Sequence, residues 1–276
     1  MIEIKVRLAV EHTEVLIAEL YAKGFDSFAE NEEGFDAYVE EKLFDEKDLN
    51  DFFAQYTLQI PLSYTIGKLE HKNWNAEWEK SFSPVVIAEK CLIRATFHEP
   101  GPAYPYEIII DPKMAFGTGH HETTSMMVEL QLSINHKDKN VLDAGSGTGI
   151  LAIMASKLGA KHVDAYDIDE WAFENINENS ILNDCSNIKS YQGDIKNIFL
   201  PLQEYDIILA NINKNVLLQE IPVYSSYLKK NGLLALSGFY EDDIQDLEKV
   251  INLNALRITH RSSNNHWACV VAEKVI

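Results

Sequence analysis

The sequence predicts an α/β protein in which a mostly parallel, Rossmann-like sheet follows a small N-terminal α+β domain. Three observations lead to this prediction. From residue 126 onward, helical and strand patterns alternate, which is typical of a parallel sheet covered by helices on both faces. Residues 1–66 show a different order, strand-helix-strand-strand-helix-strand. A glycine-rich turn at residues 145–149 joins an apolar strand to an apolar helix.

Residues 1–66 have the element order of a ferredoxin-like module. Apolar and charged residues alternate over 2–10, as in a half-buried strand, and helical periodicity follows over 14–23. Thr13 is a candidate cap of this helix and Gly24 its stop. Two short strand patterns, 25–30 and 35–40, flank a hairpin turn, and a helix at 45–56 and a strand at 58–66 complete the module. Such a fold implies no single function.

Residues 67–83 predict a polar helical linker that carries Trp74 and Trp78, and residues 84–276 form the second predicted domain. Strand patterns at 85–88, 91–96 and 106–110 open this domain, with a loop rich in Pro and Gly at 99–105. Further strands are expected at 141–144, 162–166, 205–209 and 268–272. We expect His266 and Trp267, which precede the last strand, to have a structural role.

The net charge of −19 argues against nucleic acid as the main ligand, because phosphate binding depends on Lys and Arg. Residues 1–60 hold 15 Asp and Glu against 5 Lys and Arg, so this fifth of the chain carries about half of its net negative charge. An acidic surface steers basic partners, and it also serves solubility; the charge alone leaves both interpretations open. The three cysteines lie far apart and show no metal spacing, which suits a reducing cytosol. The first residues lack the apolar core of a signal peptide, and no run is long enough to span a membrane. We therefore expect a soluble cytoplasmic protein with no metal and no membrane contact.

The glycine-rich turn and the strand ends near it form the candidate ligand site. Glycines at 145, 147 and 149 permit a tight turn and a close approach of the backbone to a ligand. Asp167 ends the next predicted strand 22 residues after Gly145, where a carboxylate can bind ribose hydroxyls. Asn211 ends a later strand. These positions share the carboxyl edge of the sheet, where open α/β sheets bind ligands.

A nicotinamide dehydrogenase is the main competing enzyme class. Its fingerprint is G-x-G-x-x-G, whereas this turn reads G-x-G-x-G, with Ile150 where the third glycine would fall. The observed spacing is the one associated with S-adenosylmethionine, a cofactor that has no pyrophosphate. The spacing therefore favours methyl transfer.

The segment 111–124, Asp-Pro-Lys-Met-Ala-Phe-Gly-Thr-Gly-His-His-Glu-Thr-Thr, resembles the signature loop of the ribosomal protein L11 methyltransferases. Lys113 stands where this family usually has glycine, and His120 where threonine is common. The resemblance continues through 141–153, 167–169, 210–212 and 236–238, and it includes the linker with Trp74 and Trp78. It implies a class I methyltransferase sheet behind an acidic ferredoxin-like domain that recognises the substrate.

Carried over position by position, the resemblance implies that Thr124, Gly145, Asp167 and Asn211 bind S-adenosylmethionine. Thr124 would offer a hydroxyl near the methionine end, and Gly145 and Gly147 would give close backbone approach. Asp194, after the third strand, is either a contact of the adenine edge or a turn residue. Phe116 either closes over the sulfonium and substrate or packs within its loop. The implied partner is ribosomal protein L11, free or on the ribosome, methylated on its N-terminal α-amine and on lysine ε-amines.

Asn211 is the candidate catalytic residue, since its side-chain carbonyl could accept a hydrogen bond from the attacking amine and aim the lone pair. His120 and His121 titrate near neutrality and are weighed as proton acceptors, but ordering of the loop is the favoured interpretation, and no general base is assigned. A methyltransferase acting on a small molecule or RNA is the alternative function. A non-catalytic ribosome-associated module is a third possible function. The intact turn at residues 145–149, called the glycine loop below, disfavours it, as do Asp167 and Asn211.

Overall fold

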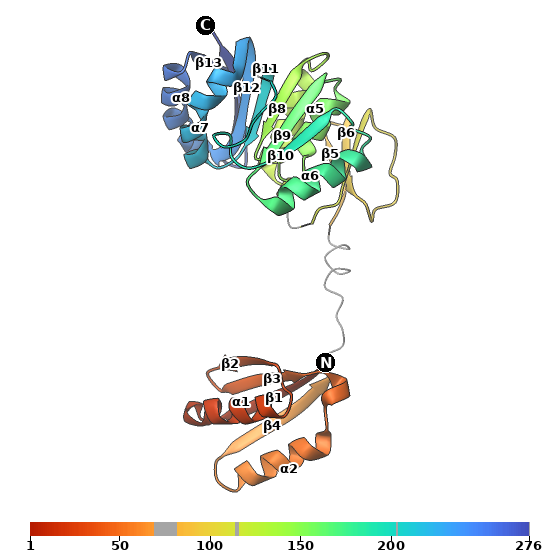
Figure 1. Cartoon of the computed structure of the whole chain (residues 1–276), viewed down its shortest axis with the longest axis vertical. Coiled ribbons are helices and arrows are strands. Elements are labelled where there is room, and N and C mark those ends of the chain that lie inside the picture. Colours follow the sequence, from red (N-terminus) through yellow and green to blue (C-terminus); the bar gives the residue numbers. More distant parts are fainter. Residues whose placement is uncertain (69–81, 114–115, 203, 276) are drawn as a thin grey trace. The chain divides into compact units, whose positions relative to one another are not determined.

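The computed structural model describes residues 1–68, 82–113, 116–202 and 204–275, and the chain divides into two compact units. The N-terminal unit is Met1–Ser81 and the C-terminal unit is Phe82–Ile276 (Figure 1). Each unit has a hydrophobic core of its own. The predicted linker with Trp74 and Trp78 falls almost wholly at 69–81, outside the described residues, so the predicted domain boundaries stay a prediction.

The N-terminal unit is a ferredoxin-like domain, as predicted from the order of its elements. Its antiparallel sheet has the strand order β2-β3-β1-β4, and alternate β1 residues pack with α1 and α2 in one core. The elements are β1 (Ile2–Leu8), α1 (Thr13–Ala22), β2 (Ser27–Asn31), β3 (Gly34–Val39), α2 (Glu46–Thr57) and β4 (Leu62–Lys68), with short 3-10 turns at Val10–His12 and Glu41–Leu43.

Two local predictions for this unit were wrong. Thr13 does not cap α1 but is its first residue, and the capping position, His12, makes no side-chain cap hydrogen bond. The last strand starts at Leu62 instead of residue 58. The N–H groups of Gln59 and Ile60 donate back to the carbonyl of Tyr56, so these residues finish the helix end and cannot join the sheet.

The C-terminal unit contains a seven-stranded sheet with the order β10-β9-β8-β11-β12-β14-β13. Neighbours from β10 to β12 are parallel, and β14 runs antiparallel to both β12 and β13. The strands are β8 (Asn140–Ala144), β9 (His162–Asp167), β10 (Ile188–Gln192), β11 (Tyr205–Asn211), β12 (Leu228–Tyr240), β13 (Leu256–Asn264) and β14 (Trp267–Lys274). This is the Rossmann-like sheet that the alternating pattern predicted.

Helices cover both faces of this sheet (Figure 1). One core gathers α4 (Glu122–Ser133), α5 (Ile150–Lys157) and α6 (Glu170–Leu182), and the other gathers α7 (Lys214–Tyr227) and α8 (Ile244–Leu253). A separate small sheet, β5-β6-β7, precedes them with strands Val85–Ile87, Cys91–Ala95 and Tyr106–Ile110. Among the described helices, none is long and apolar enough to cross a membrane.

Two asparagines of α6 and a third, which directly follows the helix, hold β7 and the chain after it. Asn175, Asn179 and Asn183 are four residues apart, so they lie along one side of the helix. Asn183 accepts from the N–H of Ile109 and donates to its carbonyl, and Asn175 donates to the carbonyl of Asp111. Asn179 accepts from the N–H of Asp111 at 2.8 Å and donates to the carbonyl of Thr148 at 2.8 Å. It therefore ties the signature loop to the glycine loop.

Replacing Asn179 with alanine should destabilise the C-terminal unit by about 2–4 kcal/mol, because two buried backbone groups would lose their partners. Asn179 is fully buried. Asn177, which lies exposed on the same helix, provides a matched control, and Asn177→Ala should change the free energy of unfolding by about 0.5 kcal/mol or less. Urea unfolding of the full chain measures both. Equal effects of the two substitutions would contradict this role of Asn179.

Candidate active site

The glycine loop follows β8 and leads into α5. Gly145, Gly147 and Gly149 have φ values of +64°, +55° and +79°, in the left-handed region that side chains disfavour. A Cβ on Gly145 would lie 2.3 Å from Ile212 Cγ2, and one on Gly147 would lie 2.2 Å from the carbonyl oxygen of Phe116. Both positions therefore need glycine for their backbone conformation and for the space around them.

Asp143 anchors this loop from inside the sheet. Its carboxylate is fully buried, and one oxygen accepts from the Ser146 hydroxyl at 2.5 Å and from the Ala152 N–H at 3.0 Å. The other oxygen is buried without a hydrogen-bond partner. Burial raises the pKa of Asp143 to about 7, against the lowering effect of its two donors, and the nearby charge of Asp167 adds to the rise.

Asp167 binds the backbone of the glycine loop at Gly147. One carboxylate oxygen accepts from the Gly147 N–H at 2.9 Å, and the other accepts from the Asp169 N–H at 3.0 Å. Asp169 in turn caps α6 by accepting from the N–H of Trp171 at 2.9 Å. The predicted acidic strand end thus lies directly beside the glycine loop.

The signature loop packs onto the glycine loop through Thr148. The Thr148 N–H donates to the carbonyl of Phe116 at 2.9 Å, and its hydroxyl donates to the carbonyl of Gly117 at 2.5 Å. The Phe116 side chain is 54% exposed. Its ring lies 5.4 Å from that of His121, which lies 4.7 Å from the ring of Trp267. These three rings form an aromatic row at the carboxyl edge of the sheet.

A cavity of about 620 Å³ opens among these elements, within the size range of small-molecule sites. Five of the predicted residues line it together with the aromatic row: Gly145, Gly147, Asp167, Asn211 and Phe116. His121, weighed as a proton acceptor, also lines it, and its Nδ1 accepts from the N–H of Thr123 at the start of α4.

Three predicted residues do not line this cavity. Thr124 is buried behind Asn211, whose side-chain N–H donates to the Thr124 hydroxyl at 3.3 Å. Asp194 accepts from the Lys196 N–H and from the Asn197 side chain, as a turn residue does. His120 Nε2 lies 2.8 Å from the backbone carbonyl oxygen of Ser83, within hydrogen-bond distance.

Sequence reasoning missed several wall residues, among them Trp267 and Glu220. Trp267 was expected to have a structural role, yet its ring lines the cavity and stacks on Tyr240 at 4.2 Å. The antiparallel pairing of β14 with β12 brings Trp267 beside Tyr240, and no local pattern reveals that pairing. Glu220 also lines the cavity, but in the sequence it looks like any polar residue in an amphipathic helix.

The cavity fits S-adenosylmethionine by its donor and acceptor groups. Asn211 Oδ1 is buried at this wall and has no hydrogen-bond partner, so it is available to a ligand donor. A dinucleotide pyrophosphate would favour Lys or Arg in the wall. Neither is among the described residues that line the cavity. Across the described residues, no group of three or more His, Cys, Asp or Glu could hold a metal ion. Fold and site together define a class I S-adenosylmethionine-dependent methyltransferase.

Comparisons with known proteins specify the family. The family model described as ribosomal protein L11 methyltransferase (PrmA) matches residues 6–275. The chain is 44% identical over 249 residues to a protein of that name from Phocaeicola vulgatus, covering 90% of this chain and 88% of that protein. The corresponding values for Bacteroides thetaiotaomicron are 42% over 259 residues, 93% and 92%. The chain therefore belongs to the ribosomal protein L11 methyltransferase family, as its signature loop predicted.

A solved structure agrees with this assignment. The ribosomal protein L11 methylase of Lactobacillus delbrueckii subsp. bulgaricus superimposes with a TM-score of 0.64 at 26% identity. The match covers 71% of this chain and 99% of that one.

Asp143 should make the stability of the C-terminal unit decline as the pH rises. The pKa of its carboxyl is about 7 in the folded protein, against about 3.9 for an unfolded chain. The folded state binds this proton more tightly, so the stabilisation is complete below about pH 4 and is lost as the pH rises toward about 7. The difference corresponds to about 4 kcal/mol, at about 1.36 kcal/mol for each pKa unit.

Urea unfolding at several pH values between about 4 and 8 measures this decline. Asp143→Asn should lack it, because an amide does not titrate there. The exposed Asp138→Asn, in a surface turn before β8, should retain it. Parallel pH profiles for the wild type and Asp143→Asn would show that the Asp143 proton is not linked to folding.

Proposed function

We propose that this protein transfers methyl groups from S-adenosylmethionine to ribosomal protein L11 in the cytoplasm, on the N-terminal α-amine and on lysine ε-amines. The observation that carries this proposal is the unpartnered, buried Oδ1 of Asn211 at the wall of the cavity. The names of the relatives, which align over about nine-tenths of the chain, support the substrate.

The cofactor-binding roles follow from the positions of the side chains. Gly145 and Gly147 would bring backbone close to the cofactor, and Asp167 keeps lone pairs for the ribose hydroxyls beyond its two backbone donors. Asn211 would meet the methionine end, and Thr124 would act through its contact with Asn211. A contact of Asp194 with the adenine stays a prediction, since its carboxylate caps a turn in the structure.

The bound cofactor supplies an electrophilic methyl group on its sulfonium. The protein must align an amine with the methyl–sulfur bond, and alignment of this kind accounts for about 7–11 kcal/mol in the best intramolecular reactions. The amine must also be unprotonated, which for a lysine of pKa about 10.4 costs about 4 kcal/mol near neutral pH. Asn211 Oδ1 would accept a hydrogen bond from this amine, and the aromatic row of Phe116, His121 and Trp267 would exclude water around it.

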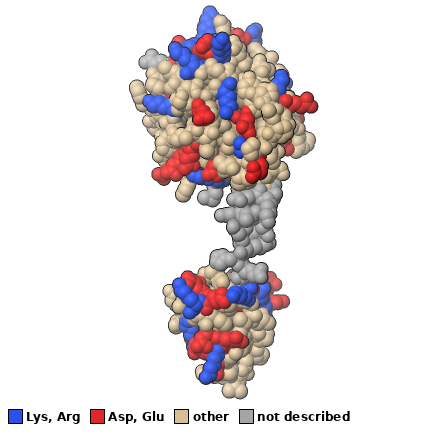
Figure 2. All heavy atoms as spheres, turned by 90° about the vertical axis from the view of Figure 1, so that its right-hand side faces the viewer, with Lys and Arg blue, Asp and Glu red and all other residues tan. Residues whose placement is uncertain are grey.

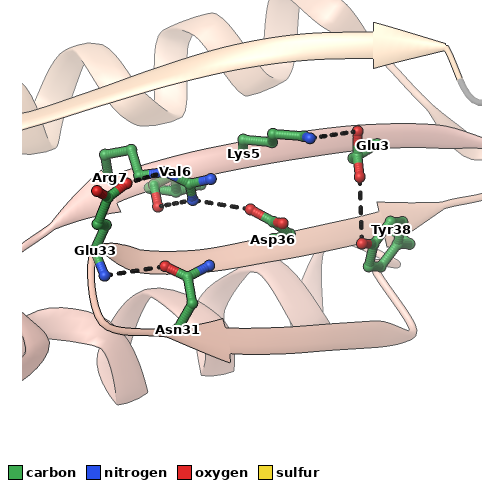
Figure 3. Close-up of polar contacts among 8 residues, drawn as sticks. All are labelled: Glu3, Lys5, Val6, Arg7, Asn31, Glu33, Asp36 and Tyr38. Atoms are coloured by element: carbon green, nitrogen blue, oxygen red, sulfur yellow. Dashed lines mark hydrogen bonds and ion pairs between the residues drawn. The ribbon is translucent and has the colours of Figure 1, made fainter.

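The N-terminal unit would dock the basic ribosomal protein. The helices cover one face of its sheet, while Glu3, Lys5, Arg7, Asp36 and Tyr38 project from the other (Figure 3). Arg7 pairs with Asp36 at 2.8 Å and Lys5 with Glu3 at 3.5 Å.

Figure 2 shows cations of this unit beside carboxylates on the face in view. Residues 1–60 hold 15 Asp and Glu against 5 Lys and Arg, and most of these carboxylates are exposed. Such a field accelerates encounter with a basic protein and repels RNA.

Incubation of the full chain with labelled S-adenosylmethionine and free L11 should label L11 amino groups, located by mass spectrometry. Asn211→Ala should lower the turnover number by about 100-fold, the typical effect of removing one group that orients or stabilises the reacting atoms. Asn215→Ala, an exposed asparagine in α7, should leave it unchanged. Label on RNA or on another protein, or unchanged turnover in Asn211→Ala, would contradict the proposal.

Deleting residues 1–66 should abolish L11 methylation and preserve cofactor binding. The C-terminal unit has its own cores, so the truncated chain should fold and bind S-adenosylmethionine with wild-type affinity. Calorimetry measures the binding, and transfer of label to L11 measures the activity. A truncated enzyme that methylated L11 at the normal rate would rule out docking by the N-terminal unit.

A further inference from the structure

A buried carboxylate on α7 forms part of the cavity wall. Glu220 is 9% exposed and lines the cavity together with Tyr166. Its Oε2 accepts from the Tyr166 hydroxyl at 3.2 Å and from the Tyr224 hydroxyl, and the two hydroxyls lie 3.0 Å apart. Residues 214–227 form α7, so Glu220 lies near the middle of the helix, away from both helix ends.

The charge of Glu220 is compensated less than that of the other carboxylates on the wall. Asp167 and Asp169 accept from backbone N–H groups, and Asp169 also caps the N-terminus of α6, where the helix dipole favours a negative charge. Glu220 has only hydroxyl donors among its described partners. Burial raises the pKa values of Tyr166 and Tyr224, so both stay neutral donors. No Lys or Arg lines the described cavity.

A buried carboxylate without a cationic partner costs folding free energy unless a positive charge enters its surroundings. The cofactor of this enzyme class brings such a charge, since its sulfonium is a permanent cation. The product, S-adenosylhomocysteine, carries a neutral thioether at the same atom and keeps every other group. The two molecules therefore differ by one positive charge at the sulfur. The described wall of the cavity carries three carboxylates, Glu220, Asp167 and Asp169, and no Lys or Arg.

We propose that Glu220 makes the cavity favour the cationic cofactor over its neutral product, and thereby limits product inhibition. Glu220 acts through the field it places in the cavity and takes no part in bond making, so it is a specificity-determining residue. The inference rests on the cofactor assignment of the proposed function and is independent of the identity of the methylated protein.

The test is the affinity of the full chain for S-adenosylmethionine and for S-adenosylhomocysteine, each measured by calorimetry. Glu220→Gln keeps the size of the side chain and an acceptor for the tyrosines, but removes the charge. It should weaken cofactor binding about tenfold, which corresponds to about 1.4 kcal/mol, and change product binding by about twofold or less. The ratio of the two affinities should thus move toward the product.

Asp164→Asn is the matched control. Asp164 is also a buried carboxylate that accepts from tyrosine hydroxyls, Tyr205 at 2.7 Å and Tyr191 at 3.0 Å. Its Oδ1 also lies 2.8 Å from His162 Nε2, and Asp164 does not line the cavity. Its substitution should leave the ratio of the two affinities at the wild-type value. If Glu220→Gln fails to fold, Glu220→Met carries the same test, because a buried charge can often be replaced by an apolar side chain of similar volume.

Equal weakening of both ligands, or of neither, in a folded neutral variant would overturn the inference, because a merely structural role cannot distinguish sulfonium from thioether. An equal shift of the ratio in Asp164→Asn would overturn it as well. Failure on these grounds leaves methylation of L11 intact. Failure of the proposed function would instead appear as an enzyme that shows the charge preference but labels no L11.

Discussion

The carboxylate of Asp143 holds two segments that must stay together for the site to exist. It accepts from the Ser146 hydroxyl inside the glycine loop and from the Ala152 N–H inside α5, so the turn and the helix share one anchor. Gly147 then points its N–H toward Asp167, which fixes the end of β9 against the same loop. Because the anchor is buried, these bonds are shielded from water and hold the loop in one conformation. The cost is a carboxyl whose pKa is raised to about 7.

The signature loop depends on the glycine loop in turn. Thr148 donates to the carbonyls of Phe116 and Gly117, and the missing side chain of Gly147 leaves room for the Phe116 carbonyl. From the other side, Asn179 bridges Asp111 and Thr148. Phe116 of the aromatic row is therefore held by the same glycine loop that lines the cavity. One connected set of hydrogen bonds would thus align both the cofactor and the amine. Such preorganisation suits an in-line methyl transfer, in which the protein mainly has to align the amine with the methyl–sulfur bond.

Carboxylates occur in different surroundings in the two units, at the surface of the N-terminal unit and in the interior of the C-terminal unit. In the N-terminal unit most carboxylates are exposed, where they would act at a distance on the basic partner that we propose. In the C-terminal unit, Asp143 and Glu220 are buried, where each acts on its immediate neighbours and a single charge has a large effect. A cationic cofactor and a basic protein substrate are both consistent with this distribution.

The sequence by itself determined the element order of the N-terminal unit and the alternating helix and strand pattern of the C-terminal unit. It also determined the glycine loop, the strand-end residues Asp167 and Asn211, and the family through residues 111–124. These features depend on local periodicity, on glycine's conformational freedom and on contiguous motifs, all of which can be read along the chain. Only the tertiary structure decided that Trp267 and Glu220 line the cavity, that Thr124 lies behind Asn211, and that Asp194 caps a turn. Trp267 reaches the site through antiparallel pairing of β14 with β12. Glu220 reaches it through the packing of α7 against β11 and β12, which brings its carboxylate to the Tyr166 hydroxyl. Such placements depend on contacts between residues distant in the chain, which no local pattern encodes.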